Sequence, residues 1–98
     1  MSYQTLTLET DNHVATITLN RPEMMNAFSE QLIWEMGEAT KAVKDDAQIR
    51  VLVITGQGRG FTAGADLGER DASWTDTKDA LERGYYPFIK NIIDMLKP

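Results

Sequence analysis

The sequence predicts an α/β domain whose elements follow in the order strand, strand, helix, strand, helix. Apolar residues alternate over residues 3–9 and again over residues 14–19, which is typical of paired β-strands. Side chains suited to a core then recur at steps of three and four over residues 32–43, which indicates an amphipathic helix. A run rich in β-branched residues at 49–55 predicts a further strand.

The first two strands are expected to form a hairpin. Leu6 and Leu8 share one face of the first strand, and Ile17 and Leu19 share one face of the second. The Asp-Asn pair at 11–12 has the composition of a tight turn. We therefore expect antiparallel pairing around that pair.

A helix of roughly four turns is expected next. Pro22 breaks the second strand, because proline cannot donate to a central ladder. Ser29 is a good helix N-cap, although Asn26 competes for that role. Residues 44–46 end the helix. Its packing face consists of Leu32, Ile33, Met36, Ala39, Thr40 and Val43.

Another strand and helix follow. Residues 49–55 are mostly apolar and predict a buried strand that is parallel to its neighbour. Residues 71–76 are polar and predict a loop. Residues 77–96 predict a helix, which Pro87 either kinks or divides at Tyr86. The apolar stripe of this helix consists of Leu81, Tyr85, Phe88, Ile89, Ile92, Ile93 and Leu96.

Composition excludes several classes of protein. The formal net charge of −5 weighs against a nucleic-acid-binding role. No cysteine is present, which excludes disulfides and thiolate metal sites, and we assign no metal site. No apolar run approaches the about 20 residues needed to span a bilayer. Residues 1–4 lack the start of a secretory signal, so we expect a cytoplasmic protein.

The stretch from residue 56 to residue 64 is the most informative one, because four of its nine residues are glycine. It follows the predicted strand and leads into residues 65–70, which can open a short helix. A glycine turn at a helix start presents free N–H groups that can bind an anion or a developing oxyanion. Taken alone, the glycines favour a strand–turn–helix connection without a ligand over an anion-binding site. Their G-x-G-x-G spacing disfavours a dinucleotide-binding loop.

A resemblance adds to this. Residues 61–67, Phe-Thr-Ala-Gly-Ala-Asp-Leu, resemble the signature of the crotonase family, the enoyl-CoA hydratase/isomerase superfamily. Residues 13–23 resemble the first hairpin strand of that family and the turn after it. Residues 26–29 resemble its helix-opening segment, and residues 95–98 the point before its next buried strand. The resemblance spans nearly all 98 residues in the expected order.

The resemblance implies an α/β crotonase-like fold of repeated β-β-α units. Because family members are much longer, residues 1–98 would be the N-terminal portion of a single domain. This portion would pair with the missing C-terminal part of the subunit, and the subunit would assemble into a homotrimer or hexamer. The implied reaction, as in fatty acid metabolism, is hydration of trans-2-enoyl-CoA through an enolate-like thioester. No cofactor is required beyond the coenzyme A thioester that serves as substrate.

The resemblance also implies site residues. The backbone N–H of Ala65 would be one of two oxyanion-hole donors, each lowering the barrier by about 3–4 kcal/mol. The second donor and both catalytic carboxylates would lie beyond residue 98, so this chain alone is expected to be inactive. The implied substrate-binding residues are Arg21, Met24, Ala27, Ala63, Gly64, Ala65, Asp66 and Leu67.

One departure from the family concerns phosphate binding. Many relatives carry a lysine where this chain has Met24, and that lysine can reach phosphate. Either Arg21 or a residue beyond this chain would substitute for that lysine, or the affinity for phosphate would be weaker than in those relatives. A solvated turn residue is an equally good interpretation of Arg21. Arg50 and Arg59 are further candidates for binding the anionic coenzyme A.

Other polar residues have plain explanations. Asp66 and Glu69 could share one helix face, but acidic residues in a first helical turn complement the helix dipole, so we assign neither as acid or base. His13 is expected to be an exposed turn residue. The aromatic-proline segment at 85–88 resembles a branch of the family that isomerises ring-derived acyl-CoA, although ordinary helix packing explains it equally well.

Alternative functions remain open from the sequence. One alternative is an acyl-CoA double-bond isomerase on the same scaffold, which would need a single acid/base group. Its substrate could be a ring-derived acyl-CoA. Dehalogenases, decarboxylases and thioester hydrolases of the family are further alternatives. A different class is a non-catalytic module or complementation fragment that binds coenzyme A or a partner chain.

Overall fold

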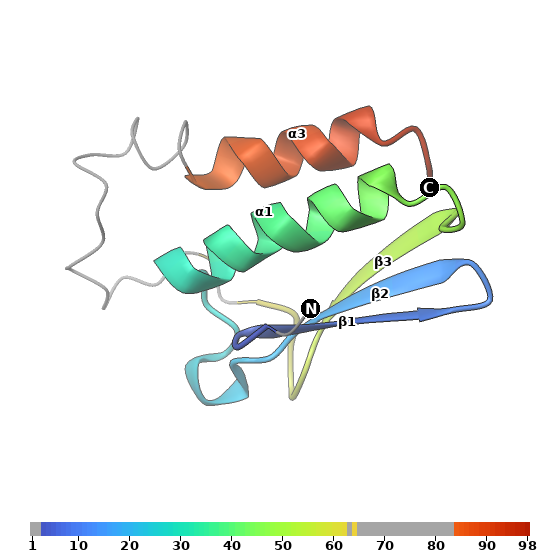
Figure 1. The fold of residues 1–98 in the computed structure, drawn as a ribbon. Coiled ribbons are helices and arrows are strands. Elements are labelled where there is room, and N and C mark those ends of the chain that lie inside the picture. Colours follow the sequence, from blue (N-terminus) through green and yellow to red (C-terminus); the bar gives the residue numbers. More distant parts are fainter. Residues whose placement is uncertain (1–2, 63, 65–83) are drawn as a thin grey trace.

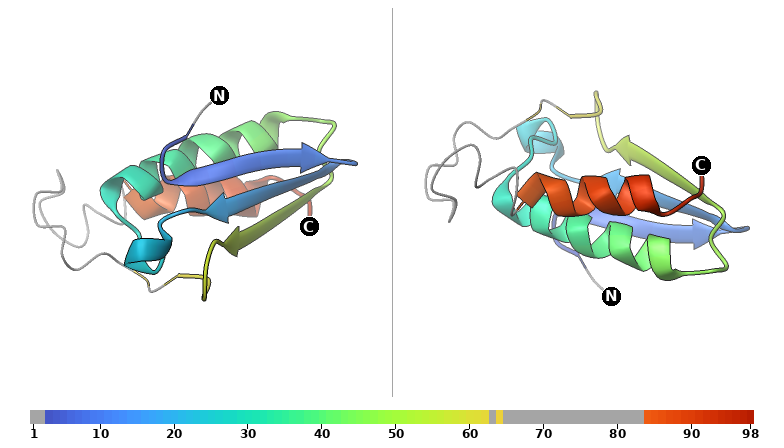
Figure 2. Two further views of the ribbon diagram at one scale, coloured as in Figure 1. Left: turned by 90° about the horizontal axis from the view of Figure 1, so that it is seen from below. Right: turned by 90° about the horizontal axis from the view of Figure 1, so that it is seen from above.

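A computed structural model of the chain describes residues 3–62, 64 and 84–98. In Figures 1 and 2, two helices lie on one face of a three-stranded sheet. The predicted α/β class and order of elements are confirmed for this part of the chain. The elements are β1 (Leu6–Asp11), β2 (Val14–Leu19), the 3-10 helix η1 (Pro22–Met24), α1 (Glu30–Asp45), β3 (Val51–Gly56) and α3 (Tyr86–Asp94).

The hairpin turns one residue later than predicted. Strands β1 and β2 are antiparallel with Asp11 opposite Val14, so the turn consists of Asn12 and His13. Their φ angles of 50° and 69° are left-handed, as both central residues of a type I′ turn require. β1 therefore begins and ends later than the predicted residues 3–9. His13 is exposed, as expected.

β3 is parallel to β2, as predicted, with Val14 opposite Val51. The prediction that it is buried is wrong, because Val53 is 42% exposed and its neighbours are half-buried. Among the described strands β2 alone pairs with β3. On the other edge, the Leu52 N–H donates to the Pro98 carbonyl at 2.8 Å. β3 is thus an edge strand in this structure.

α1 contributes more buried residues to the core than any other described element. Ser29 is its N-cap, with Oγ accepting a hydrogen bond from the Leu32 N–H at 3.1 Å. Every residue of the predicted packing face is buried. These side chains pack against Leu6, Ile17 and Leu19 of the sheet. The helix therefore fixes where the segment before Ser29 meets the carboxyl ends of the parallel strands.

α3 is shorter than the predicted helix. It begins at Tyr86 with Pro87 in the first turn, where the missing N–H of proline costs no helix hydrogen bond. It ends at Asp94, and the extension to Leu96 is wrong, since that residue has a φ of 56°. Residues 77–83 of the prediction lie outside the described residues. No helix of the described part is both long and apolar enough to cross a membrane.

The predicted stripe of α3 is only partly buried. Phe88 is buried, and its ring centroid lies 6.0 Å from that of Phe28 and 6.1 Å from that of Tyr85. This aromatic cluster joins α3 to the segment before α1. Ile93 and Leu96, in contrast, are 70% and 95% exposed.

Lys97 ties the segment after α3 to the end of α1. Its ammonium group donates to the carbonyls of Val43 at 2.8 Å, Asp46 at 2.9 Å and Ile49 at 2.8 Å. The last carbonyls of a helix have no intrahelical partner, and a cation there also complements the helix dipole. Lys97 therefore completes the carboxyl end of α1.

β3 ends at Gly56, where the chain turns back on itself closely. A Cβ atom at Gly56 would lie 2.4 Å from the Phe61 carbonyl oxygen and 2.8 Å from Asn26 Nδ2. Real Cβ atoms do not approach other atoms so closely. A side chain at this position would therefore displace the loop that follows β3.

Glu35 is a buried carboxylate of α1 that holds the chain before β1. Its Oε1 accepts hydrogen bonds from the N–H groups of Gln4 and Thr5 at 2.9 Å and from Thr5 Oγ1 at 3.0 Å. Its Oε2 accepts one from Gln31 Nε2 at 2.5 Å. Burial favours the neutral acid, but the hydrogen bonds together outweigh burial and lower the pKa of Glu35.

The Gly56→Ala substitution is expected to lower the free energy of unfolding by about 2 kcal/mol or more, because the loop must move away from the new methyl group. Gly60→Ala is the matched control, since a Cβ there meets nothing within 4 Å. Chemical denaturation of the full-length protein measures both. Equal stability of the two variants would contradict the close packing around Gly56.

The Glu35→Gln substitution is expected to destabilise the protein by about 1–3 kcal/mol at neutral pH, because the hydrogen bonds lose their charged acceptor. The folded-state pKa of Glu35 lies below the ordinary 4.5, so this contribution is complete above pH 4.5 and disappears as the pH falls through the lowered value. The stability difference from wild type should therefore shrink on acidification. Denaturation curves at several pH values test this, with Glu38→Gln on the exposed face as control. A difference that stays constant with pH would refute it.

Candidate functional site

The candidate site lies where the carboxyl ends of β2 and β3 meet the start of α1. Because β2 and β3 are parallel, the segments that leave them emerge at the same edge of the sheet. These segments are residues 20–29, which contain η1, and residues 57–62 (Figure 1). Ligands of open α/β sheets bind outside the carboxyl ends of strands, so this edge is the expected place for a site.

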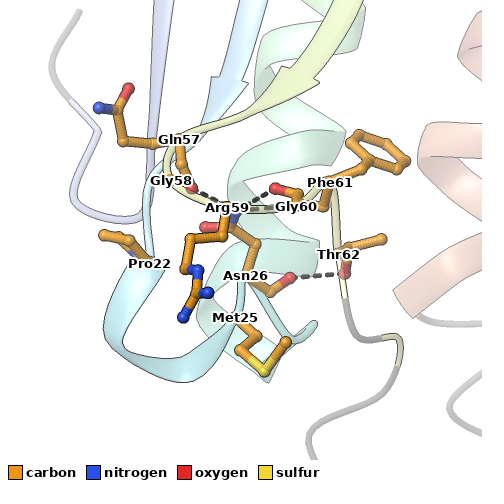
Figure 3. A pocket seen from close by; sticks show the side chains of 9 residues that line it. All are labelled: Pro22, Met25, Asn26, Gln57, Gly58, Arg59, Gly60, Phe61 and Thr62. Atoms are coloured by element: carbon orange, nitrogen blue, oxygen red, sulfur yellow. Dashed lines mark hydrogen bonds between the residues drawn. The ribbon is translucent and has the colours of Figure 1, made fainter.

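Asn26 joins the two segments. Its Oδ1 accepts a hydrogen bond from the Arg21 N–H at 2.7 Å. Its Nδ2 donates to the carbonyls of Gln57 at 2.9 Å and Phe61 at 3.0 Å, with a longer contact of 3.4 Å to that of Gly60 (Figure 3). Asn26 is 1% exposed, so water does not compete for these partners.

Thr62 and Gly64 extend this connection. Thr62 Oγ1 donates to the Asn26 carbonyl at 2.6 Å and accepts a hydrogen bond from the Gly64 N–H at 3.1 Å. The Gly64 carbonyl in turn accepts one from the Phe28 N–H at 2.6 Å. Gly64 has a φ of 94°, which favours glycine. The end of the glycine segment is thereby fixed to the residues just before α1.

A pocket of about 490 Å³ opens between the two segments, lined by Pro22, Met25, Asn26 and residues 57–62 (Figure 3). Arg59 carries the one charged side chain among the described lining residues, and it extends between Pro22 and Met25. Its surroundings are otherwise apolar or uncharged. The pocket therefore suits an anionic group attached to a less polar body.

Three of the predicted substrate-binding residues lie around η1. Arg21 is half-buried and its Nη1 donates to the Ala27 carbonyl, so the interpretation as a solvated turn residue is wrong. Met24 is half-exposed on η1. Ala27 is buried, and its N–H donates to the Met24 carbonyl at 3.1 Å.

Of the predicted substrate-binding residues at 63–67, the structure describes Gly64, whose carbonyl accepts a hydrogen bond from the Phe28 N–H. Four other predicted site residues, and Glu69, are outside the described residues. They are Ala63, Ala65, Asp66 and Leu67. The described part of the chain holds no group of three or more His, Cys, Asp or Glu side chains arranged for a metal ion.

The sequence interpretation missed the role of Asn26, which it weighed as a helix cap. One signal pointed elsewhere: asparagine tolerates left-handed backbone, and Asn26 has a φ of 55° in a turn. Nothing in local sequence, however, indicates that its side chain reaches carbonyls more than thirty residues away.

Comparison with known proteins supports the family resemblance of the sequence. The family model described as Enoyl-CoA hydratase/isomerase matches residues 9–98. A 1,2-epoxyphenylacetyl-CoA isomerase from Escherichia coli is 40% identical over 89 residues, covering 87% of this chain and 34% of the relative. A crotonyl-CoA hydratase from Syntrophomonas wolfei is 40% identical over 68 residues, covering 68% of this chain and 26% of the relative.

Solved structures agree. An enoyl-CoA hydratase from Mycobacterium marinum matches with a TM-score of 0.78 and 39% identity, over 97% of this chain and 46% of that one. An enoyl-CoA hydratase/carnithine racemase from Magnetospirillum magneticum matches with a TM-score of 0.86 and 27% identity, over 99% of this chain and 38% of that one. The chain thus spans about a quarter to a third of the curated relatives' length and less than half of these solved chains. With its fold and nearly its whole sequence matched, the chain belongs to the enoyl-CoA hydratase/isomerase family, the crotonase superfamily.

Proposed function

We propose that this chain is the N-terminal portion of a longer enzyme subunit that adds water to trans-2-enoyl-CoA thioesters. The observation that carries the proposal is the anchored glycine segment at the carboxyl edge of β2 and β3, in a chain of this family. Relatives named as hydratases support the reaction class.

The chemistry needs a site for transient negative charge. A general base takes one proton from water as the water oxygen bonds to the β-carbon, and the electrons of the double bond shift toward the thioester oxygen. They return as a general acid gives a proton to the α-carbon. Donors already in place stabilise that oxygen as charge develops on it. We assign the Ala65 N–H as one donor, and expect the second donor and two carboxylates from the remainder of the subunit. Hydration involves no net oxidation or reduction, so we expect no cofactor besides the coenzyme A of the substrate.

We further propose that coenzyme A lies along Met24, Ala27 and residues 63–67, with Arg59 taking the place of the missing lysine at a phosphate. Arg21 is less suited, because its guanidinium already binds the Ala27 carbonyl. Arg59 lines a pocket to which no described residue contributes a carboxylate. An arginine there would attract phosphate despite the net charge of −5.

An acyl-CoA isomerase is the second candidate. The relative named 1,2-epoxyphenylacetyl-CoA isomerase is 40% identical over 87% of this chain, which favours an isomerase of ring-derived acyl-CoA as the alternative to a hydratase. The choice depends on acid and base groups in the remainder of the subunit. A trimeric or hexameric assembly and a role in fatty acid metabolism remain predictions from the family resemblance, and a cytoplasmic location remains a prediction from residues 1–4.

The full-length protein is expected to convert a trans-2-enoyl-CoA into a product heavier by one water, as mass spectrometry of the product measures. Ala65→Pro removes the proposed donor N–H and should lower kcat about 100-fold or more, whereas Ala65→Gly retains it and should stay within a few fold of wild type. A product of unchanged mass with a shifted double bond would favour the isomerase instead. Equal activity of the two variants would refute the role of Ala65.

The Arg59→Ala substitution is expected to raise KM for enoyl-CoA about tenfold with little change in kcat, because a charge-assisted contact to phosphate is lost. The effect should weaken at high salt. Arg50→Ala is the matched control, since Arg50 precedes β3 at the opposite end of the strand. The proposal fails if Arg59→Ala also raises KM for an enoyl-pantetheine, which lacks the nucleotide phosphates.

A further inference from the structure

We infer that Asn26 and Thr62 are positioning residues that hold the glycine segment as far as Gly64, the residue before the proposed oxyanion donor Ala65. This inference rests on the proposed function, since it concerns how that site is held. It follows from one unbroken series of hydrogen bonds that runs from the turn after β2, through the glycine segment, and back to the start of α1.

The first step is the fixing of the glycine loop by the Asn26 side chain. Its Nδ2 hydrogens face the carbonyls of Gln57 and Phe61, and its Oδ1 faces the Arg21 N–H. The opposite orientation of the amide would point an oxygen at carbonyl oxygens and a donor at a donor. The amide group therefore has one favourable orientation, and the loop has one favourable position relative to it.

The second step is the transfer of this constraint to Gly64. The Thr62 hydroxyl has one hydrogen, which it donates to the Asn26 carbonyl at 2.6 Å. Its lone pairs then face the Gly64 N–H at 3.1 Å. The hydroxyl thus links the main chain of Asn26 to that of Gly64, and it fixes one side of Gly64.

The third step concerns the other side of Gly64. Its carbonyl accepts the Phe28 N–H at 2.6 Å, at the entry to α1. Described partners therefore hold Gly64 on both sides: the Thr62 hydroxyl at its N–H, and the Phe28 N–H at its carbonyl.

This arrangement matters for catalysis because an oxyanion donor must lie about 2.7–3.1 Å from the oxygen in the transition state. A loop that shifts by a few tenths of an ångström loses part of that stabilisation while still binding coenzyme A. The signature of a positioning role is therefore a fall in kcat at nearly constant KM, together with weaker polarisation of the bound thioester carbonyl.

The decisive experiment compares Thr62→Val with Thr62→Ser in the full-length protein. Valine keeps the shape of threonine and lacks the hydroxyl, whereas serine keeps the hydroxyl. We expect Thr62→Val to lower kcat about tenfold or more, with KM within a few fold, and Thr62→Ser to restore most of kcat. Asn26→Asp, which places a carboxylate against the loop carbonyls, should show a larger loss of kcat if it folds.

A second readout separates positioning from general damage to the fold. A conjugated aromatic enoyl-CoA bound at the site absorbs at longer wavelength when its carbonyl oxygen accepts strong hydrogen bonds. This shift should shrink in Thr62→Val and recover in Thr62→Ser. Unchanged kcat and band shift in Thr62→Val, a change in KM alone, or a serine variant as defective as valine would each overturn the inference. If wild type neither hydrates enoyl-CoA nor shifts the band, the proposed function fails and the inference fails with it.

Discussion

The buried carboxamide of Asn26 is the interaction on which the geometry of the site depends. A primary amide that is 1% exposed must satisfy its donors and acceptor within the protein, since an unpaired polar group there costs about 1–3 kcal/mol. Asn26 does so by binding groups from two segments that are distant in sequence. Any movement of either segment leaves polar groups without partners in a region that water does not reach. The restraint is therefore strong although each hydrogen bond contributes little.

The hydrophobic core brings these segments into reach of one another. The buried face of α1 packs on β1 and β2, and the Ser29 cap fixes the point at which the chain enters that helix. Parallel pairing of β2 with β3 then delivers the glycine segment to the same edge. Burial of apolar surface supplies the stability, and the amide of Asn26 selects one arrangement of the loops. The two contributions differ in kind, because the first is not directional and the second is.

Sequence patterns predicted the features that depend on near neighbours. The period of Leu32 to Val43 predicted the buried face of α1, and the hydroxyl of Ser29 predicted its cap. Patterns were less informative about pairing. The Asp-Asn pair placed the hairpin turn one residue early, and the apolar run of β3 predicted burial, whereas Val53 of this strand is exposed. These properties are set by partners, which a local pattern does not contain.

The candidate site divides in the same way. The Phe-Thr-Ala-Gly motif identified the glycine segment, because its residue types and order are distinctive. The contact between Asn26 and Gln57 spans 31 positions, and only the folded chain reveals it. Arg21 was a candidate for binding phosphate, but in the structure its guanidinium donates a hydrogen bond to the Ala27 carbonyl of its own turn. Residue type thus indicates what a group can do, and tertiary structure determines which of its abilities are already used.

The ammonium group of Lys97 links the first helix to the last residues of the chain, 54 positions beyond Val43. Without Lys97, the Val43 carbonyl keeps only the longer hydrogen bond from the Asp46 N–H, at 3.3 Å. The contact can form only after the segment that follows α3 has docked on the end of α1. An interaction that forms after the rate-limiting step of folding slows unfolding and leaves the folding rate almost unchanged. A Lys97 contact formed at that stage prolongs the lifetime of the native state.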